Sequence, residues 1–90
     1  MAASPTYRVE FTSHAAKQLR SLPRKTQERI GAKADSLSLD PRPHGVEKLA
    51  GEVNQYRVRV GDFRIIYSIE DKRLLVLVLK LGDRKDVYRP

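Results

Sequence analysis

Alternating apolar and polar positions in the second half of the chain predict a β-hairpin. Between residues 56 and 60, a tyrosine and two valines alternate with two arginines, which is the period-two pattern of a half-buried strand. Gly61 and Asp62 separate this run from a second one, and they have the length and chemistry of a two-residue hairpin turn. The register set by this turn pairs Val60 with Phe63, Arg59 with Arg64, Val58 with Ile65 and Tyr56 with Tyr67.

The predicted register divides the hairpin into an apolar face and a basic face. The core face carries Tyr56, Val58, Val60, Phe63, Ile65 and Tyr67. The other face carries Arg57, Arg59 and Arg64. Like charges directly opposite one another destabilise a strand pair by a few tenths to about 1 kcal/mol, so this cluster suggests an anionic ligand such as nucleic-acid phosphate. A solvated face whose arginine stems cover apolar surface is the alternative that the hairpin alone leaves open.

Helical periodicity predicts two helices between the first strand and a Pro-rich loop. Thr12 or Ser13 can cap the first helix, which ends before Pro23. Pro23 can also occupy the first position of the second helix, which we expect to run to about Leu37. The residues expected to face the core are Ala15, Ala16, Leu19, Leu22, Ile30, Ala34 and Leu37.

The remaining pattern predicts strands on both sides of the helices. The expected segments are a strand at 7–11, a loop at 40–45, a strand at 63–69, a turn at 70–73, a strand at 74–81, a turn at 82–85 and a short strand or extended tail at 86–89. The segment 74–81 is apolar at almost every position, which is typical of a strand covered on both faces. The fold class is therefore α+β, with an N-terminal strand and a two-helix hairpin packed on a mostly antiparallel sheet of four to five strands.

Length and composition bound the protein class. Ninety residues make a single domain, 1–90, in which residues 1–6 are expected to be a flexible leader. The chain contains no cysteine, so it offers no disulfide framework and no thiolate metal site. Its beginning has no basic region followed by an apolar run, and its longest apolar stretch is too short to span a bilayer. We therefore expect a soluble, cytoplasmic protein that does not bind membranes.

The charge balance indicates a polyanionic partner. Eighteen basic residues against eleven acidic ones give a net charge of +7 and a pI near 10.1. Lys25, Arg29 and Lys33 are four residues apart on the second helix, and with Lys85 they are candidates for RNA binding. For each of these residues taken singly, an ordinary solvated surface position is the alternative.

Few catalytic chemistries fit the remaining residues. His14 and His44 have no third ligand at a recognisable metal-site spacing, and the chain has no Gly-rich phosphate loop or nucleophile motif. RNA cleavage by its own 2′-OH needs no cofactor: the enzyme aligns ribose and phosphate, removes one proton and stabilises charge. Arginines suit the last need, and Tyr88 beside Arg84 could supply the base if nearby guanidiniums lower its pKa.

Two longer segments resemble a known family. Tyr56-Arg-Val-Arg-Val-Gly-Asp-Phe-Arg-Ile-Ile-Tyr67 and Leu81-Gly-Asp-Arg-Lys-Asp-Val-Tyr88-Arg resemble the RelE branch of the RelE/ParE toxins, as do Asp40-Pro-Arg-Pro and Lys48-Leu-Ala-Gly51 before the hairpin. The resemblance implies a RelE-like fold and cleavage of mRNA in the ribosomal A site by metal-independent 2′-OH attack. It places catalytic residues at Arg57, Arg59, Arg64, Arg84 and Tyr88.

The resemblance also implies partners. These are a cognate RelB-like antitoxin, the ribosome and mRNA, with operator DNA bound only through the antitoxin complex. We expect the antitoxin to cover exposed apolar surface, because the apolar segment 74–81 exceeds what one sheet face needs. Two other functions remain open: a ParE-like toxin that inhibits DNA gyrase without cutting RNA, and a non-catalytic RNA-binding protein.

Overall fold

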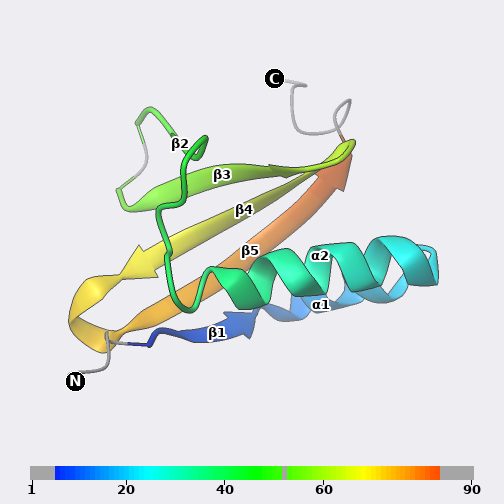
Figure 1. The fold of residues 1–90 in the computed structure, drawn as a ribbon, viewed down its shortest axis with the longest axis horizontal. Helices are drawn as coiled ribbons and strands as arrows, with labels where there is room; N and C mark the ends of the chain where they lie inside the picture. The colour runs from blue at the N-terminus through cyan, green and yellow to red at the C-terminus, as the bar shows by residue number, and fades with distance from the viewer. Residues whose placement is uncertain (1–5, 52, 84–90) are drawn as a thin grey trace.

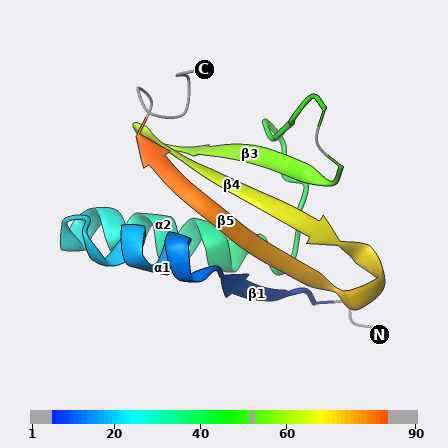
Figure 2. The ribbon, with the colours of Figure 1, turned by 180° about the vertical axis from the view of Figure 1, so that it is seen from behind.

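Five strands form one sheet, and two helices lie side by side along it (Figures 1 and 2). The structure is a computed structural model, and it describes residues 6–51 and 53–83. In chain order the elements are β1 (Arg8–Phe11), α1 (Ser13–Arg20), α2 (Arg24–Ser36), β2 (Glu47–Lys48), β3 (Gln55–Val60), β4 (Phe63–Glu70), the 3-10 turn η1 (Asp71–Arg73) and β5 (Leu75–Asp83). None of the helices in the described ranges is long and apolar enough to cross a membrane.

The sheet is mostly antiparallel, as the sequence predicts. The strand order is β1-β5-β4-β3-β2, and Figure 2 shows β5 running between β1 and β4. In the described part of the chain, β1 and β5 form the one parallel pair; β5 with β4, β4 with β3 and β3 with β2 are antiparallel. The α+β fold class is therefore confirmed, and the sheet has five strands.

The central hairpin has the predicted register. Val60 pairs with Phe63, and Arg59 lies directly opposite Arg64. Gly61 adopts φ +60°, a left-handed conformation that glycine reaches without steric penalty, so the two-residue turn fits its sequence. The alternation then sends one set of side chains toward the helices. This core set, with its helical partners, comprises Ala15, Ile30, Leu37, Tyr56, Val58, Ile65, Tyr67, Ile69, Val76, Val78 and Leu81.

Both helices begin close to the predicted positions. Thr12 is the N-cap of α1: its Oγ1 accepts a hydrogen bond from the Ala15 N–H at 3.1 Å. The same hydroxyl donates to the Leu79 carbonyl at 3.0 Å, which ties the start of α1 to β5. Pro23 is the N-cap of α2 and not its first helical residue, a difference of one position.

Strand β5 departs from the prediction at its end. Gly82 and Asp83, expected in a turn, continue β5 and lie opposite Arg64 and Phe63. The predicted turn at 82–85 is wrong there because pairing with β4 continues as far as the hairpin turn. The strand β2 was not predicted, since two exposed residues carry no periodic signal.

The apolar run at 74–81 is buried by the described part of the chain at some positions and only partly at others. Leu75 and Val76, neighbours on opposite faces, are 4% and 0% exposed. Leu77 and Leu79 of this run are half-buried, and Leu74, its first residue, is 38% exposed. The expectation that a partner covers part of this run therefore stays a prediction.

Candidate nucleic-acid interface

Three arginines share the face of the hairpin that points away from the helices. Arg59 and Arg64 are directly opposite one another, and Arg57 is two residues from Arg59 on the same strand. Because Val58 and Ile65, the intervening neighbours, belong to the helix-covered core, the arginines occupy the other face. The sequence-based placement of the three guanidinium groups on one face is confirmed.

The three arginines differ in how firmly they are held. Arg64 is only 6% exposed, although it carries a charge. Arg57 forms an ion pair with Glu47 of β2 at 2.8 Å, and its side chain is 18% exposed. Arg59 is exposed, and its Nε donates to the Gly61 carbonyl at 2.9 Å, so its side chain leans toward the hairpin turn. The cluster thus combines the buried Arg64, the ion-paired Arg57 and the exposed Arg59.

Such an arrangement suits a polyanion better than it suits the free fold. Two like charges in directly opposite positions repel, and burying one of them removes water that would otherwise screen it. A phosphate between the strands would reverse the sign of the interaction, because the planar guanidinium donates two parallel hydrogen bonds to phosphate oxygens.

Arg29 connects helix α2 with the hairpin turn. Its guanidinium lies so close to Gly61 that a Cβ built there would stand 2.9 Å from Nη2 and 3.2 Å from Nη1. A small hollow of about 140 Å³ separates α2 from the turn and is lined by Thr26, Arg29, Val60, Asp62 and Phe63. Lys25, one helical turn earlier, is exposed, and Lys33, one turn later, is half-buried.

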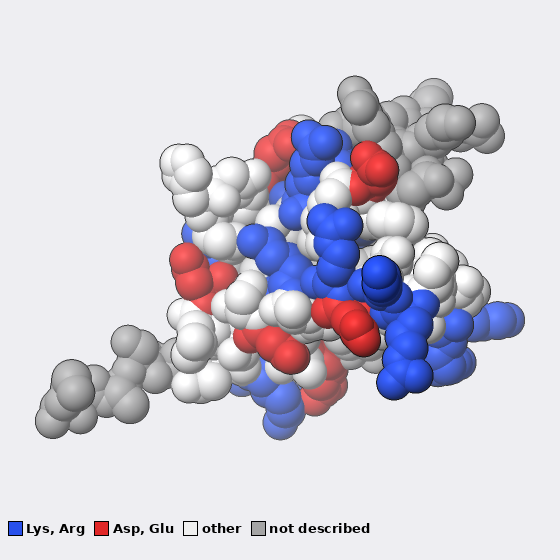
Figure 3. All heavy atoms as spheres, turned by 45° about the vertical axis from the view of Figure 1, so that its right-hand side comes forward, with Lys and Arg blue, Asp and Glu red and all other residues white. Residues whose placement is uncertain are grey.

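Lysines and arginines gather at this end of the molecule. In Figure 3 they form a band from the top of the view to its lower right, with single acidic groups beside it. In Figure 1 the hairpin turn lies at the upper right and the helices at the lower right, so the band extends from the hairpin toward the helices. The start of α2 and the hairpin turn thus belong to one end of the protein, where Arg29 lies beside Gly61.

Three predicted site residues lie outside the described ranges: Arg84, Lys85 and Tyr88. The last described residue, Asp83, lies opposite Phe63, next to the Arg59–Arg64 pair. Figure 1 shows the end of β5 beside the hairpin turn.

A second polar cluster, which the sequence did not reveal, joins four segments at the other end of the sheet. Arg42 donates two hydrogen bonds to Asp71, at 2.9 and 3.1 Å, and its Nε donates to the Tyr56 hydroxyl at 3.1 Å. Tyr7 donates to the same carboxylate at 2.6 Å. These bonds from Arg42 and Tyr7 lower the pKa of Asp71, and the hydrogen bond to Asp71 raises the pKa of Tyr7.

This cluster fastens the Pro-rich loop to the sheet. Tyr67 is fully buried and donates to the Pro41 carbonyl at 2.7 Å, next to Arg42. Burial raises the pKa of the Tyr67 hydroxyl, so it stays a neutral donor. The only signal in the sequence was a breaker-rich loop, which does not identify the partners of its arginine.

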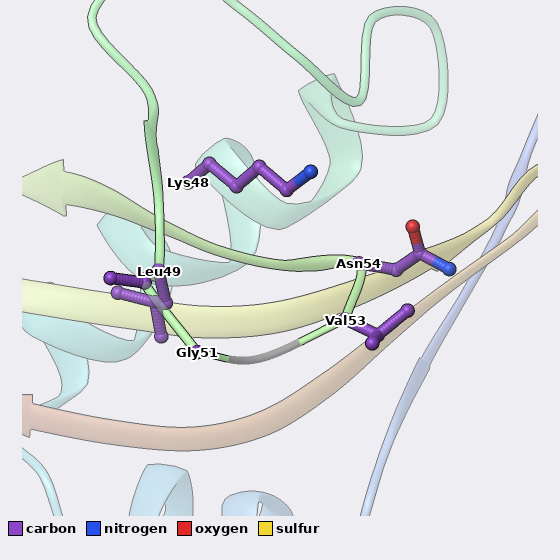
Figure 4. Close-up of a pocket in the computed structure, with 6 residues that line it drawn as sticks. Lys48, Leu49, Gly51, Val53 and Asn54 are labelled. Atoms are coloured by element: carbon purple, nitrogen blue, oxygen red, sulfur yellow. The ribbon is translucent and has the colours of Figure 1, made fainter.

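A shallow, open hollow of about 420 Å³ lies beside the segment between β2 and β3 and is lined by Lys48, Leu49, Ala50, Gly51, Val53 and Asn54 (Figure 4). In Figure 4 Leu49 points to one side of the loop, and Val53 and Asn54 point to the other. The hollow adjoins the opposite end of β3 from the hairpin turn, so it is separate from the arginine face. His14 and His44 are both exposed, and no group of three potential metal-ligating side chains occurs within the described ranges.

Comparison with known proteins gives a consistent result. The chain matches the family described as the ParE toxin of type II toxin–antitoxin systems, parDE, over residues 9–88. It is 30% identical to toxin RelG of Mycobacterium tuberculosis, in an alignment that covers 92% of this chain and 97% of the relative.

Solved structures agree with the sequence match. The toxin–antitoxin complex RelE–RelB from Pyrococcus horikoshii OT3 superimposes with a TM-score of 0.79 and 38% identity, over 88% of this chain and 96% of the other. The isolated Escherichia coli RelE toxin gives a TM-score of 0.76 and 25% identity, over 86% of this chain and 83% of that one.

Proposed function

This chain belongs to the RelE/ParE superfamily of toxins of type II toxin–antitoxin systems, and we propose that it is a ribosome-dependent endoribonuclease. Its substrate is mRNA in the ribosomal A site, and the reaction uses the 2′-OH of the RNA without a metal ion. The observation that carries the proposal is the pair Arg59–Arg64, two directly opposed cations of which Arg64 is 6% exposed.

The burial of Arg64 supports a role in stabilising the transition state. A charge held in a fixed position needs little reorganisation when negative charge develops on a bound phosphate, and a partly desolvated site strengthens the interaction. Arg57 is held in place by Glu47, which favours a positioning role on the mRNA. Arg59 is accessible, so it can contact the RNA strand directly.

The proposed reaction is an in-line displacement at phosphorus. The 2′-oxygen forms a bond to the adjacent phosphorus as its proton passes to a base, and the bond to the 5′-oxygen of the next nucleotide breaks. The leaving oxygen takes up a proton, so the products are a 2′,3′-cyclic phosphate and a 5′-hydroxyl. Arg64 and Arg84 would contact the non-bridging oxygens, where the extra charge develops.

Tyr88 is the proposed general base. A phenol normally has a pKa near 10, and neighbouring guanidiniums would lower it by favouring the phenolate. Arginine is unsuited to this role because it stays protonated.

The proposed protein partner is a RelB-like antitoxin. The support is the family of the chain and the likeness to complexes of RelE with RelB from Pyrococcus horikoshii and of RelBE2 from Mycobacterium tuberculosis. Lys25, Arg29, Lys33 and Lys85 would contribute to binding RNA on the ribosome. Operator DNA would be bound only through the antitoxin complex.

Single-turnover cleavage of mRNA on programmed ribosomes tests the proposal. We expect Arg64→Ala to lower the rate by a factor on the order of 100 or more, which is typical for loss of one charge stabiliser. Arg73→Ala is the matched control, because it removes the same charge from η1, beyond the far end of β4. Unchanged cleavage by the Arg64 variant, or equal losses in both variants, would contradict the assignment.

A ParE-like activity is the second candidate, favoured by the family description that the chain matches. Such a toxin would inhibit DNA gyrase and leave RNA intact. A variant lacking Arg64, Arg84 and Tyr88 distinguishes the two functions. Persisting toxicity with inhibited supercoiling would identify the gyrase inhibitor, and loss of toxicity together with loss of mRNA cleavage would identify the nuclease.

A further inference from the structure

Two arginines approach the hairpin turn from opposite sides of the sheet. Arg59 extends from the face away from the helices, and its Nε donates to the Gly61 carbonyl at 2.9 Å. Arg29 comes from α2, on the helix-covered side, and its guanidinium atoms lie 2.9–3.3 Å from the position that a Cβ on Gly61 would occupy. Gly61 is therefore the common contact of a sheet arginine and a helix arginine.

Among the described residues, no carboxylate forms an ion pair with either of these guanidinium groups. Within residues 6–51 and 53–83, the arginines that form ion pairs are Arg8, Arg42, Arg57 and Arg73. Asp62 lines the same hollow as Arg29, yet no ion pair within these residues joins it to Arg29 or Arg59. A guanidinium has five N–H donors, and Arg59 uses only its Nε on the turn. Both side chains thus retain donors for an anion.

We propose that the RNA backbone crosses the tip of the hairpin, where Arg59 binds it on one side and Arg29 on the other. From there the strand continues along α2 past Lys25, following the basic band in Figure 3. This path rests on the proposed function and adds the direction in which the substrate leaves the arginine face. Gly61 adjoins the site, because a Cβ there would displace the Arg29 guanidinium from its present position beside the turn.

Binding of a short single-stranded RNA made of 2′-O-methyl nucleotides tests the path without requiring cleavage, because the nucleophile is blocked. Fluorescence anisotropy with the full chain, across a salt series, gives the affinity and its salt slope. We expect Arg29→Ala to weaken binding roughly tenfold and to reduce the slope by about one, as for the loss of one phosphate contact. Arg29→Lys should restore most of the slope, and Arg73→Ala should leave both values unchanged.

Two substitutions in the turn sharpen the test. Asparagine tolerates positive φ, so Gly61→Asn preserves the backbone conformation of the turn. Its Cβ nevertheless displaces the Arg29 guanidinium. Because Arg29 is exposed and can shift while keeping its charge nearby, we expect Gly61→Asn to weaken RNA binding by less than Arg29→Ala does, with no further loss when it is added to Arg29→Ala. Asp62→Asn removes the nearby negative charge and should strengthen binding.

The outcomes separate the path from the nuclease activity. If Arg29→Ala lowers only the melting temperature, with affinity and salt slope unchanged, the path is overturned even if Arg64→Ala abolishes cleavage. A wild-type chain that fails to bind the RNA at low salt would also overturn it. If binding depends on Arg29 while the wild-type chain cleaves no mRNA on ribosomes, the path is supported and the nuclease proposal fails.

Discussion

Replacing Arg59 by glutamate should stabilise the fold while removing part of the proposed RNA site. Arg59 lies directly opposite Arg64, and Arg64 is 6% exposed, so the repulsion between them is only partly screened by water. A directly opposed pair of like charges destabilises by a few tenths to about 1 kcal/mol, and an opposite pair stabilises by a similar amount. The exchange of one for the other should therefore gain roughly 0.5–2 kcal/mol before any loss elsewhere.

Arg59→Gln is the matched control for this prediction. Both variants lose the hydrogen bond from the Arg59 Nε to the Gly61 carbonyl, and both place a side chain of similar size on β3. Their difference thus reports charge alone, and we expect the glutamate variant to be more stable by about 0.3–1 kcal/mol. For a chain of 90 residues, each kilocalorie raises the melting temperature by about 4–8 °C.

Thermal unfolding followed by circular dichroism and urea unfolding with a constant m-value would measure the difference. The stability difference between the glutamate and glutamine variants should shrink in about 1 M salt, where the Debye length falls to about 3 Å. A glutamate variant that unfolds at the same temperature as the glutamine variant, or below it, in low salt would refute the claim that the basic face destabilises the free fold. The same substitution should reduce cleavage, as expected where function and stability conflict.

Two further predictions concern the polar cluster around the Pro-rich loop. Tyr67→Phe removes the donor to the buried Pro41 carbonyl and should lower the free energy of unfolding by about 1–2 kcal/mol, measured by urea denaturation. The pKa of Asp71 is lowered in the folded state by Arg42 and Tyr7, so its stabilising contribution is complete above the unfolded value near 4 and is lost as the pH falls through the lower folded value. Asp71→Asn should therefore be less stable than the wild type at neutral pH, with the gap closing in acid; a pH-independent gap would contradict this assignment.

The central hairpin was predictable because its determinants are local. The alternation of apolar residues with arginines, together with the Gly61–Asp62 turn, specifies which residues face each other, since a shift by one position would turn the arginines toward the helix-covered core. The helix start at Thr12 was predictable for the same reason, because a cap is an interaction with the next turn of the chain. The catalytic roles proposed for Arg57, Arg59, Arg64, Arg84 and Tyr88 remain predictions, as do the RNA-binding roles proposed for Lys25, Arg29, Lys33 and Lys85.

Other features depend on contacts between distant segments, and local patterns do not encode these. The apolar residues 74–81 indicate a covered strand. Which strands pair with it, including the parallel pairing of β5 with β1, depends on where the two helices position β1 relative to the rest of the sheet. The continuation of β5 through Gly82 and Asp83 depends on pairing with β4, and the bonds of Arg42 to Asp71 join residues 29 positions apart.

The periodicity of side chains along the backbone was enough to establish the α+β class, the hairpin register and a common face for three arginines. It could not establish that Arg64 is nearly inaccessible while Arg59 is free to reach the turn, or that Arg29 meets Gly61 from the helix side. Local patterns state only which side of an element a residue occupies. Burial and contact between separate elements depend on the packing of the whole chain, which the tertiary structure alone decides.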